Sequence, residues 1–352
     1  MAMQKNKVTV RTIAQRAGVS PATVSRVLSQ ADYNVNASLR KKVIQTAEEA
    51  GFFVKTKETA AVEDTEKIEI AMIVPNLSNP YFWQIAMGVE SEAHQKNVNV
   101  YLCNSLRETA QETKYMHSLH QKGISGILLS PISTDYSEII ALQKQGMNIV
   151  LLEQSAPALN CRKVLFNYLS AAKMAMSHLT TNGHSDIAFV TSPITQDSRR
   201  DIFLGYQLGL LDAGLTFQEN HVITAQSESE FSSEFYEYEL GRACSIPFTK
   251  LIPRPTAVLC LNDMIALGFI AGLQSMGIRV PQDVSVIGLD NIHAGLMSTP
   301  TLTTVSQPAF EIGKLAYKML MEAIRADFSE NLSVSVEPYL VERESVAPLG
   351  KL

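Results

Sequence analysis

The spacing of hydrophobic residues changes once along the chain, near residue 67. Before that point apolar residues recur at intervals of three and four positions, the period of amphipathic helices. Three stripes are visible: Val10, Ile13, Ala14 and Ala17; Val24, Val27 and Leu28; and Leu39, Val43, Ile44 and Ala47. Beyond it, continuous apolar runs of strand length follow one another. The pattern predicts three short helices followed by a much larger α/β part.

The residues between the first two stripes are typical of a tight turn. Gly18 provides a flexible backbone, Ser20 is a good N-cap, and Pro21 suits the first helical position because its missing N–H costs nothing there. We expect the third helix to start after Asn36 and to stop at Gly51. Two helices joined by a short turn and supported by a third form a helix-turn-helix.

The larger part contains ten strand-like runs, most of them separated by helical stretches. The runs are IEIAMIVP, VNVYLCN, ISGILLS, MNIVLLE, VLFN, DIAFVTS, HVITA, TAVLCLN, VSVIGLD and TLTTVSQ. The helical stretches are 80–96, 108–122, 168–182, 200–213, 231–246, 263–276 and 309–326. Near-continuous apolar strands that alternate with helices predict parallel sheets covered on both faces. Ten strands exceed one compact sheet, so we expect two α/β lobes.

The charge of the chain is divided unevenly between these two parts. Residues 1–60 hold ten Lys/Arg against four Asp/Glu, a balance of +6, whereas the remaining 292 residues hold 20 against 31, a balance of −11. A basic head on an acidic body suggests that the head alone binds a polyanion. Charge by itself fits a solvated basic face equally well.

A helix-turn-helix gives this basic head a specific way to bind DNA. The major groove admits one helix, and the side chains near its N-terminus reach base edges. In this chain that helix begins at Ser20. We expect Arg26 to donate to guanine, Pro21 and Ala22 to contact thymine methyl groups, and Ser20, Thr23, Ser25 and Asn36 to hold phosphates. The alternative, a three-helix bundle with a solvated face, fits the charge division and the short turn less well.

The segment TVRTIAQRAGVSPATVSRVLSQ resembles the headpiece of the lactose-repressor (LacI) family of bacterial transcription regulators. Later segments such as NPYFWQIAMGVE, PTAVLCLND and VPQDVSVIGLDN resemble that family's effector-binding core, which is similar to the type I periplasmic sugar-binding fold. The resemblance implies a headpiece at 1–53, a linker at 54–67 and a core at 68–350. It implies lobe 1 at about 68–166 and 294–327, and lobe 2 at about 167–293 and 328–345.

Ligands of parallel α/β sheets bind beyond the carboxyl ends of the strands. Short polar residues follow the strands here: Pro75–Asn76, Ser130, Glu153, Asn167, Asn262–Asp263 and Asp290. The aromatic residues Tyr81, Phe82, Trp83 and Phe231 stand at helix starts and could form apolar walls. Any single one of these could equally be a cap, a turn residue or a core residue. The resemblance assigns effector binding to Tyr81, Phe82, Ser130, Glu153, Ser198, Phe231, Asn262 and Asp290.

The chain departs from the family's pattern in two regions, at the effector-binding arginine and in the linker. The family's effector-binding arginine is replaced by Ile202, and Arg199 and Arg200 are off register, so we do not expect either to substitute. In the linker, Val54, Thr59 and Ala61 stand where the family has proline, arginine and a leucine wedge. A hinge helix is therefore not recognisable, and a weaker DNA kink, or none, is expected.

The sequence is best explained as a homodimeric transcription regulator, more readily a repressor, that binds operator DNA and responds to a sugar or sugar phosphate. The same role under control of a protein partner or a non-sugar ligand stays open. A solute-binding protein would need a secretion signal and has no use for the head. An enzyme could use Glu153, Asp263 and Asp290 as acids and bases, but no catalytic motif accompanies them.

The remaining features restrict the setting. The four cysteines are scattered without a CxxC pair, and His117 and His120 fit a solvated helix face better than a metal site, so no metal or cofactor is expected. No signal peptide and no membrane-spanning run is present. These features predict a cytoplasmic protein. The tail has no heptad run, so a tetramerising coiled coil is not expected.

Overall fold

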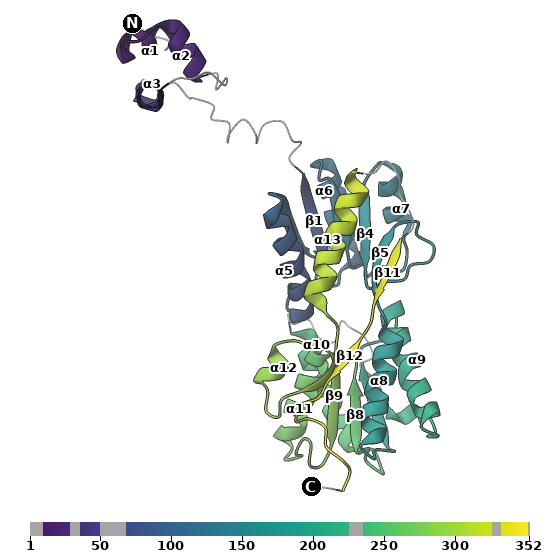
Figure 1. Cartoon of the computed structure of the whole chain (residues 1–352). Helices are drawn as coiled ribbons and strands as arrows, with labels where there is room; N and C mark the ends of the chain where they lie inside the picture. The colour runs from purple at the N-terminus through teal and green to yellow at the C-terminus, as the bar shows by residue number, and fades with distance from the viewer. Residues whose placement is uncertain (1–9, 29–35, 50–67, 225–234, 326–331, 351–352) are drawn as a thin grey trace, which may run out of the picture. The chain divides into compact units, whose positions relative to one another are not determined.

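The computed structural model of the chain describes residues 10–28, 36–49, 68–224, 235–325 and 332–350. It divides into two compact units, Met1–Ile68 and Glu69–Leu352, each with its own internal contacts (Figure 1). The linker at 54–67, with Val54, Thr59 and Ala61, lies outside the described residues, and so does Phe231.

The first unit contains the three expected helices, α1 (Val10–Ala17), α2 (Pro21–Leu28) and α3 (Ala37–Glu49). Their core takes residues from each of the three sequence stripes: Ile13, Ala14, Ala17, Val24, Val27, Val43 and Ala47. The turn between α1 and α2 contains Gly18 at φ 67°, a left-handed conformation that glycine adopts without a Cβ penalty. The helical period of the sequence is therefore confirmed by the packing.

The second unit contains two six-stranded sheets, which define two lobes (Figure 1). The first sheet has the order β11-β5-β4-β3-β1-β2, and all its described pairings are parallel. Its strands are β1 (Glu69–Val74), β2 (Asn99–Asn104), β3 (Gly126–Leu129), β4 (Asn148–Leu152), β5 (Arg162–Phe166) and β11 (Ser333–Val336). The second sheet has the order β12-β10-β9-β8-β6-β7, with only β12 antiparallel among the described pairings. Its strands are β6 (Ile187–Thr191), β7 (Val222–Thr224), β8 (Ala257–Cys260), β9 (Ser285–Asp290), β10 (Thr303–Ser306) and β12 (Tyr339–Val341).

The sheet pairings differ from the lobe boundaries that the resemblance implies. Residues 294–327 were expected in lobe 1, yet β10 pairs with β9 of the second sheet. Residues 328–345 were expected in lobe 2, yet β11 pairs with β5 of the first sheet. The chain therefore passes between the lobes three times, after β5, after β10 and after β11. The first and last of these crossings are joined, since the Asn167 backbone N–H donates to the Val336 carbonyl at 3.1 Å.

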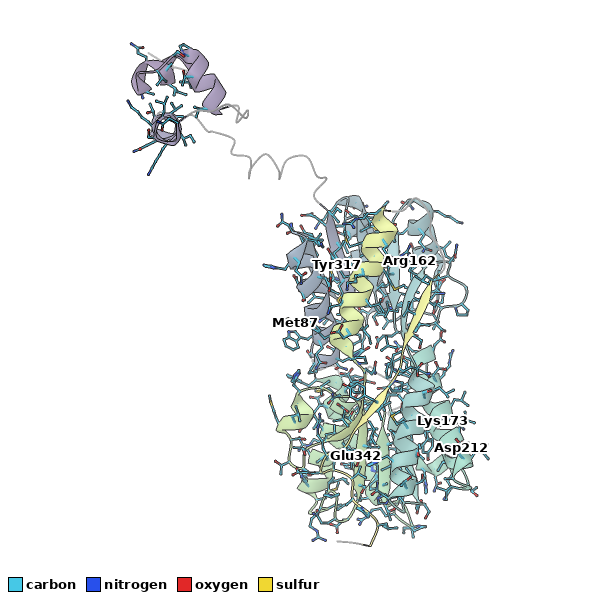
Figure 2. The ribbon with its side chains drawn as sticks, viewed as in Figure 1. Met87, Arg162, Lys173, Asp212, Tyr317 and Glu342 are labelled. Carbon is cyan, nitrogen blue, oxygen red and sulfur yellow. The ribbon has the colours of Figure 1, made fainter. Side chains whose placement is uncertain are left out.

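Helices cover both faces of each sheet, as the apolar strands predict. In lobe 1, α5 (Pro80–Gln95) and α13 (Ala309–Arg325) pack together on one face, and α6 (Thr109–Gln121) and α7 (Ser137–Lys144) cover the other. Arg162 of β5 donates to Glu322 of α13 at 2.7 Å (Figure 2). In lobe 2, α8 (Tyr168–Thr181) and α9 (Asp197–Asp212) cover one face, and α10 (Tyr236–Thr249) and α11 (Asp263–Ser275) cover the other. An ion pair of 2.8 Å joins Lys173 of α8 to Asp212 of α9 (Figure 2).

Glycine lets the paired helices approach to backbone contact. A Cβ on Gly313 of α13 would lie 2.0 Å from the Ile85 carbonyl oxygen of α5, and a Cβ on Gly241 of α10 would lie 2.0 Å from the Ile265 carbonyl oxygen of α11. A residue with a side chain at either glycine would thus force the two helices of that pair apart. Within the described residues, no helix combines the length and the apolar character needed to span a bilayer.

Candidate functional site

The proposed recognition helix of the head begins as the sequence indicates. The Ser20 hydroxyl accepts the Thr23 backbone N–H at 3.1 Å and lies 2.8 Å from the Thr23 hydroxyl, which caps the first turn of α2. Pro21 follows at the first helical position and is exposed. Ala22, Ser25 and Arg26 lie within the same helix. The cap therefore fixes where the helix starts, and the base and phosphate contacts of its residues stay predictions.

Asn36 has the same capping role at the third helix. Its side-chain oxygen accepts the Ser38 backbone N–H at 3.0 Å and the Ser38 hydroxyl at 2.9 Å. Asn36 is exposed. The side-chain oxygen of Asn36 is thus used inside the head. Its predicted phosphate contact would have to come from the side-chain NH2 group.

Seven of the eight residues expected to bind an effector line one cleft between the two lobes. Tyr81, Phe82, Ser130 and Glu153 belong to lobe 1, and Ser198, Asn262 and Asp290 belong to lobe 2. The empty space of the cleft, including the part open to solvent, is about 730 Å³. Because the carboxyl ends of both sheets face this cleft, residues far apart in sequence meet there. Phe231, the eighth, lies outside the described part of the chain.

Glu153 is the best-satisfied carboxylate of the cleft. It accepts the Tyr168 hydroxyl at 2.6 Å and the Ser130 hydroxyl at 2.8 Å. Burial raises the pKa of Glu153, while these hydroxyl groups oppose the rise because they donate to the ionised form. Its backbone has φ 68°, a left-handed conformation that is costly for a residue with a side chain. The two hydroxyl contacts hold this acceptor in its strained conformation at the end of β4.

Asp290 is the corresponding acid at the end of β9. It accepts from the Gln307 side-chain amide at 2.7 Å and has φ 121°, so it too is held in an uncommon backbone conformation. Burial raises its pKa well above the usual range, and the charges of Asp263, Glu153 and Glu237 add to this rise. Buried carboxyl groups at both lobes therefore present hydrogen-bond acceptors to the cleft.

Asp263, which the enzyme interpretation would use with Glu153 and Asp290, has a different position. It is fully buried behind the cleft, where it accepts the Thr304 hydroxyl at 2.6 Å and the Ile292 backbone N–H at 2.9 Å. These bonds hold the segment that follows β9. Asp263 is thus a structural acid and does not line the cleft.

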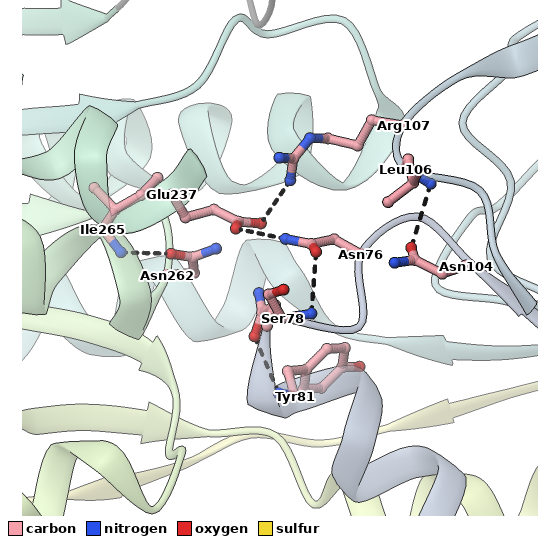
Figure 3. Close-up of polar contacts among 10 residues, drawn as sticks. Asn76, Ser78, Tyr81, Asn104, Leu106, Arg107, Glu237, Asn262 and Ile265 are labelled. Carbon is pink, nitrogen blue, oxygen red and sulfur yellow. Dashed lines mark hydrogen bonds and ion pairs between the residues drawn. The ribbon is translucent and has the colours of Figure 1, made fainter. Parts of the chain in front are cut away.

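Two asparagines illustrate how cap and site roles divide. Asn262 lines the cleft, and its side-chain oxygen also accepts the Ile265 backbone N–H at 2.9 Å, capping α11 (Figure 3). Asn167 caps α8 through the Ser170 N–H at 3.1 Å and does not line the cleft. For Asn167 the simpler interpretation, a helix cap, accounts for the residue.

Sequence reasoning missed several cleft residues: Arg107, Tyr168, Arg199, Glu237 and Gln307. Arg199 lines the cleft together with Ile202 although it is off register with the family's arginine position, and whether it can substitute there stays a prediction. The two residues are three positions apart in α9 and share a helix face. The three-residue spacing from Ile202 was a usable sequence signal that Arg199 lines the cleft. The other four residues belong to segments that reach the cleft only in the completed fold.

Of the three aromatic residues at the start of α5, two line the cleft and one does not. Tyr81 and Phe82 are buried at the cleft with ring centroids 5.3 Å apart in an edge-to-face contact. The Tyr81 hydroxyl has no hydrogen-bond partner of normal geometry among the described residues. Trp83 is half exposed and lies outside the cleft. Two aromatic rings thus form a wall beside the two acids.

Comparison with known proteins identifies both parts of the chain. The family model "Bacterial regulatory proteins, lacI family" matches residues 9–54, and "Periplasmic binding protein-like domain" matches residues 176–346. The chain is 29% identical to the HTH-type transcriptional repressor PurR of Photobacterium profundum over 344 residues, covering 97% of this chain and 99% of that protein.

Solved structures agree with this assignment. A LacI family transcriptional regulator from Enterococcus faecium with bound ribose is 26% identical with a TM-score of 0.71, covering 80% of this chain and 99% of that one. The lac repressor dimer bound to operator and the anti-inducer ONPF shares the fold at 22% identity, with a TM-score of 0.73 over 97% and 100% of the two chains. Proteins of this family are regulators and not enzymes. Residues 9–54 thus match the lacI family of bacterial regulatory proteins and residues 176–346 match a periplasmic-binding-protein-like domain, and along nearly its whole length the chain is similar to DNA-binding transcription repressors that combine the two.

Proposed function

We propose that the protein binds its operator as a homodimer through α2, and that its affinity for the operator changes when a small molecule occupies the cleft. The observation that carries the proposal is the cleft itself, where seven of the residues that the family resemblance assigns to effector binding converge. On the head, Arg26 would read guanine, Pro21 and Ala22 would contact thymine methyl groups, and Ser20, Thr23, Ser25 and Asn36 would hold phosphates. Such a regulator works in the bacterial cytoplasm, where operators are found.

A homodimer is supported by apolar side chains that lobe 1 leaves in solvent. Trp83 and Met87 lie one turn apart on α5 and are 50% and 45% exposed. Figure 2 shows Met87 on the outer side of lobe 1. Neighbouring exposed apolar side chains of this size are typical of interaction surfaces. Two linked heads also gain affinity, because the second half-site is bound at high effective concentration.

A sugar is the effector class that the cleft chemistry favours. Glu153 and Asp290 offer acceptors from opposite lobes, and a polyhydroxyl ligand can donate to both at once. Tyr81 and Phe82 provide an apolar wall for the less polar face of the ring. The similar regulator solved with ribose supports the same class. Effector binding would alter operator affinity by a coupling free energy of about 1–3 kcal/mol.

A planar nitrogen heterocycle is the second candidate effector. Aromatic rings line the cleft at Tyr81, Phe82 and Tyr168, and a flat ring could stack on them while its N–H groups donate to Glu153 or Asp290. The two effector classes would depend on different contacts in the cleft. A heterocycle would depend on ring stacking, and a sugar on many hydrogen bonds to its hydroxyl groups.

Three measurements test the proposal. Selection of duplexes from a random oligonucleotide pool at moderate salt should enrich one two-fold symmetric sequence, and enrichment of no sequence would refute operator binding. A thermal-shift screen with sugars, sugar phosphates and nucleobases should show stabilisation by one class, because a specific ligand stabilises the folded state by mass action. Stabilisation by nucleobases alone would favour the second candidate, and analytical ultracentrifugation would decide the homodimer.

A further inference from the structure

Three side chains meet across the cleft, one from lobe 2 and two from lobe 1. Glu237 lies in the first turn of α10. One of its carboxylate oxygens accepts the Asn76 side-chain amide at 3.0 Å, and the other lies 3.5 Å from Nη1 of Arg107 (Figure 3). All three residues line the cleft. The contact is therefore a direct link between the two lobes beside the proposed effector site.

Arg107 is aimed at this contact by an uncommon backbone turn. Leu106 and Arg107 have φ 54° and 60°, and both are left-handed residues with side chains. The turn is held because the Leu106 N–H donates to the Asn104 side-chain oxygen at 3.2 Å (Figure 3). The Arg107 N–H also donates to the Pro75 carbonyl at 3.0 Å. Backbone conformations of this kind persist where the surrounding structure enforces them, and they gather at functional sites. Glu153 and Asp290 of the same cleft are held in the same way.

The arginine also contacts the helix that carries its acidic partner. Its guanidinium carbon lies 4.0 Å from the ring centroid of Tyr236, the residue before Glu237. The side chains of Arg107 and Glu237 are only 16% and 12% exposed, so solvent screens their attraction less than it would screen a surface pair. A cation over an aromatic face and beside a carboxylate is held by two contacts that act together.

We propose that Glu237 forms a latch with Arg107 and Asn76, defined as these three residues, and that the latch holds the two lobes together while no effector is bound. The Nη1 atom of Arg107 is buried and makes no hydrogen bond of normal geometry, so the latch is incomplete and the guanidinium keeps a donor available. When the lobes separate, Arg107 can donate to another acceptor in the cleft. A cation from lobe 1 would then supplement Arg199, in a chain that has Ile202 at the family's arginine position.

The latch is tested on the full-length protein by the distance between its lobes without any added ligand. Spin labels are attached at exposed positions of the two lobes, through Gln145→Cys and Ala213→Cys, in a Cys103→Ser background. The labelled chain is diluted with unlabelled chain so that only distances within one chain are measured. Pulsed electron resonance then gives the interlobe distance distribution of the wild type and of each variant.

Glu237→Gln keeps the size of the side chain and removes its charge, so we expect a second, altered distance population that the wild type lacks. Arg107→Gln should add the same population, and the double variant should match the single ones because either change already breaks the latch. Glu239→Gln, an exposed charge on the same helix, is the matched control and should leave the distribution unchanged.

A wild-type distribution in Glu237→Gln would overturn the latch, and so would strictly additive effects of the two single variants. Far-UV circular dichroism of each variant verifies folding, and if Arg107→Gln fails to fold, Glu237→Gln alone decides. The latch depends only on the two-lobed core. Its failure would thus leave the proposed effector class untouched, and failure of the ligand screen would leave the latch standing.

Discussion

Replacing Glu112 by glutamine is expected to change how the stability of the core depends on pH. Glu112 lies on α6, is 2% exposed, and accepts the Ile132 backbone N–H at 3.0 Å. Burial raises the pKa of Glu112 to about 7, although the backbone N–H groups of Ile132 and Ser133 favour the ionised form. Ile132 and nearby Ser130 line the cleft, so the buried carboxyl group supports one wall of the proposed site.

The sign follows from comparing the folded and unfolded states. The pKa is about 4.5 when unfolded and about 7 when folded, so the folded chain binds the proton more tightly. The stabilising contribution of the protonated group is therefore fully present below about pH 4.5 and is lost as the pH rises through about 7. A difference of about 2.5 pH units corresponds to about 3 kcal/mol, at about 1.4 kcal/mol per unit.

Glutamine is neutral throughout and keeps an acceptor for the backbone. We expect Glu112→Gln and the wild type to have similar free energies of unfolding at pH 5, and the variant to be more stable by about 2–3 kcal/mol at pH 8. Urea unfolding at one fixed protein concentration, followed by circular dichroism between pH 5 and 8, measures this difference. The difference between the two curves of unfolding free energy against pH removes the contribution of the other buried acids, which is the same in both proteins.

Glu108→Gln, an exposed change at the start of the same helix, is the control and should follow the wild type at every pH. Parallel curves for Glu112→Gln and the wild type would refute the reasoning, because they would mean that Glu112 has the same proton affinity in both states. A variant that is less stable at pH 8 would refute it as well, since the backbone bonds would then outweigh the desolvation.

Three further predictions concern DNA, the effector and packing. Arg26→Ala should weaken operator binding by about 1–3 kcal/mol and relax one base position, and a gel-shift titration with unchanged affinity and specificity would contradict this. Asp290→Asn should abolish the effector response while operator binding persists, so normal effector affinity by calorimetry would remove Asp290 from the site. Gly313→Ala should destabilise the core by more than Gly123→Ala, because its Cβ meets the Ile85 carbonyl oxygen at 2.0 Å whereas Gly123 has only its φ of 73° to strain. Equal midpoints of thermal unfolding in the two variants would contradict the close contact of α5 and α13.

The hydrophobic pattern was sufficient for every strand that forms an apolar run and insufficient for a strand that does not. All ten apolar runs became strands. The sequence SVSV of β11 is exposed or only partly buried along its length, so no apolar run marks it as a strand. Which sheet β10 and β11 join depends on where the chain crosses between lobes, and a local pattern contains no information on that choice.

The site residues likewise fall into those that a local sequence pattern predicts and those that it does not. Glu153 and Asp290 could be predicted because they follow apolar runs, and strand ends of parallel sheets meet at one edge. Arg107 stands beyond a strand end by three residues and reaches the cleft only through two left-handed backbone positions. Glu237 and Gln307 belong to a helix start and to a crossing segment, whose positions depend on the completed fold.

The three passages of the chain between the lobes also determine how this protein can be dissected. Neither lobe is a continuous stretch of sequence, since β11 completes the first sheet and β12 completes the second, only two residues apart. A gene shortened to stop before residue 332 would thus remove an edge strand from both lobes at once. A single protease cut at any one passage would, in contrast, leave two intact peptide connections between the halves.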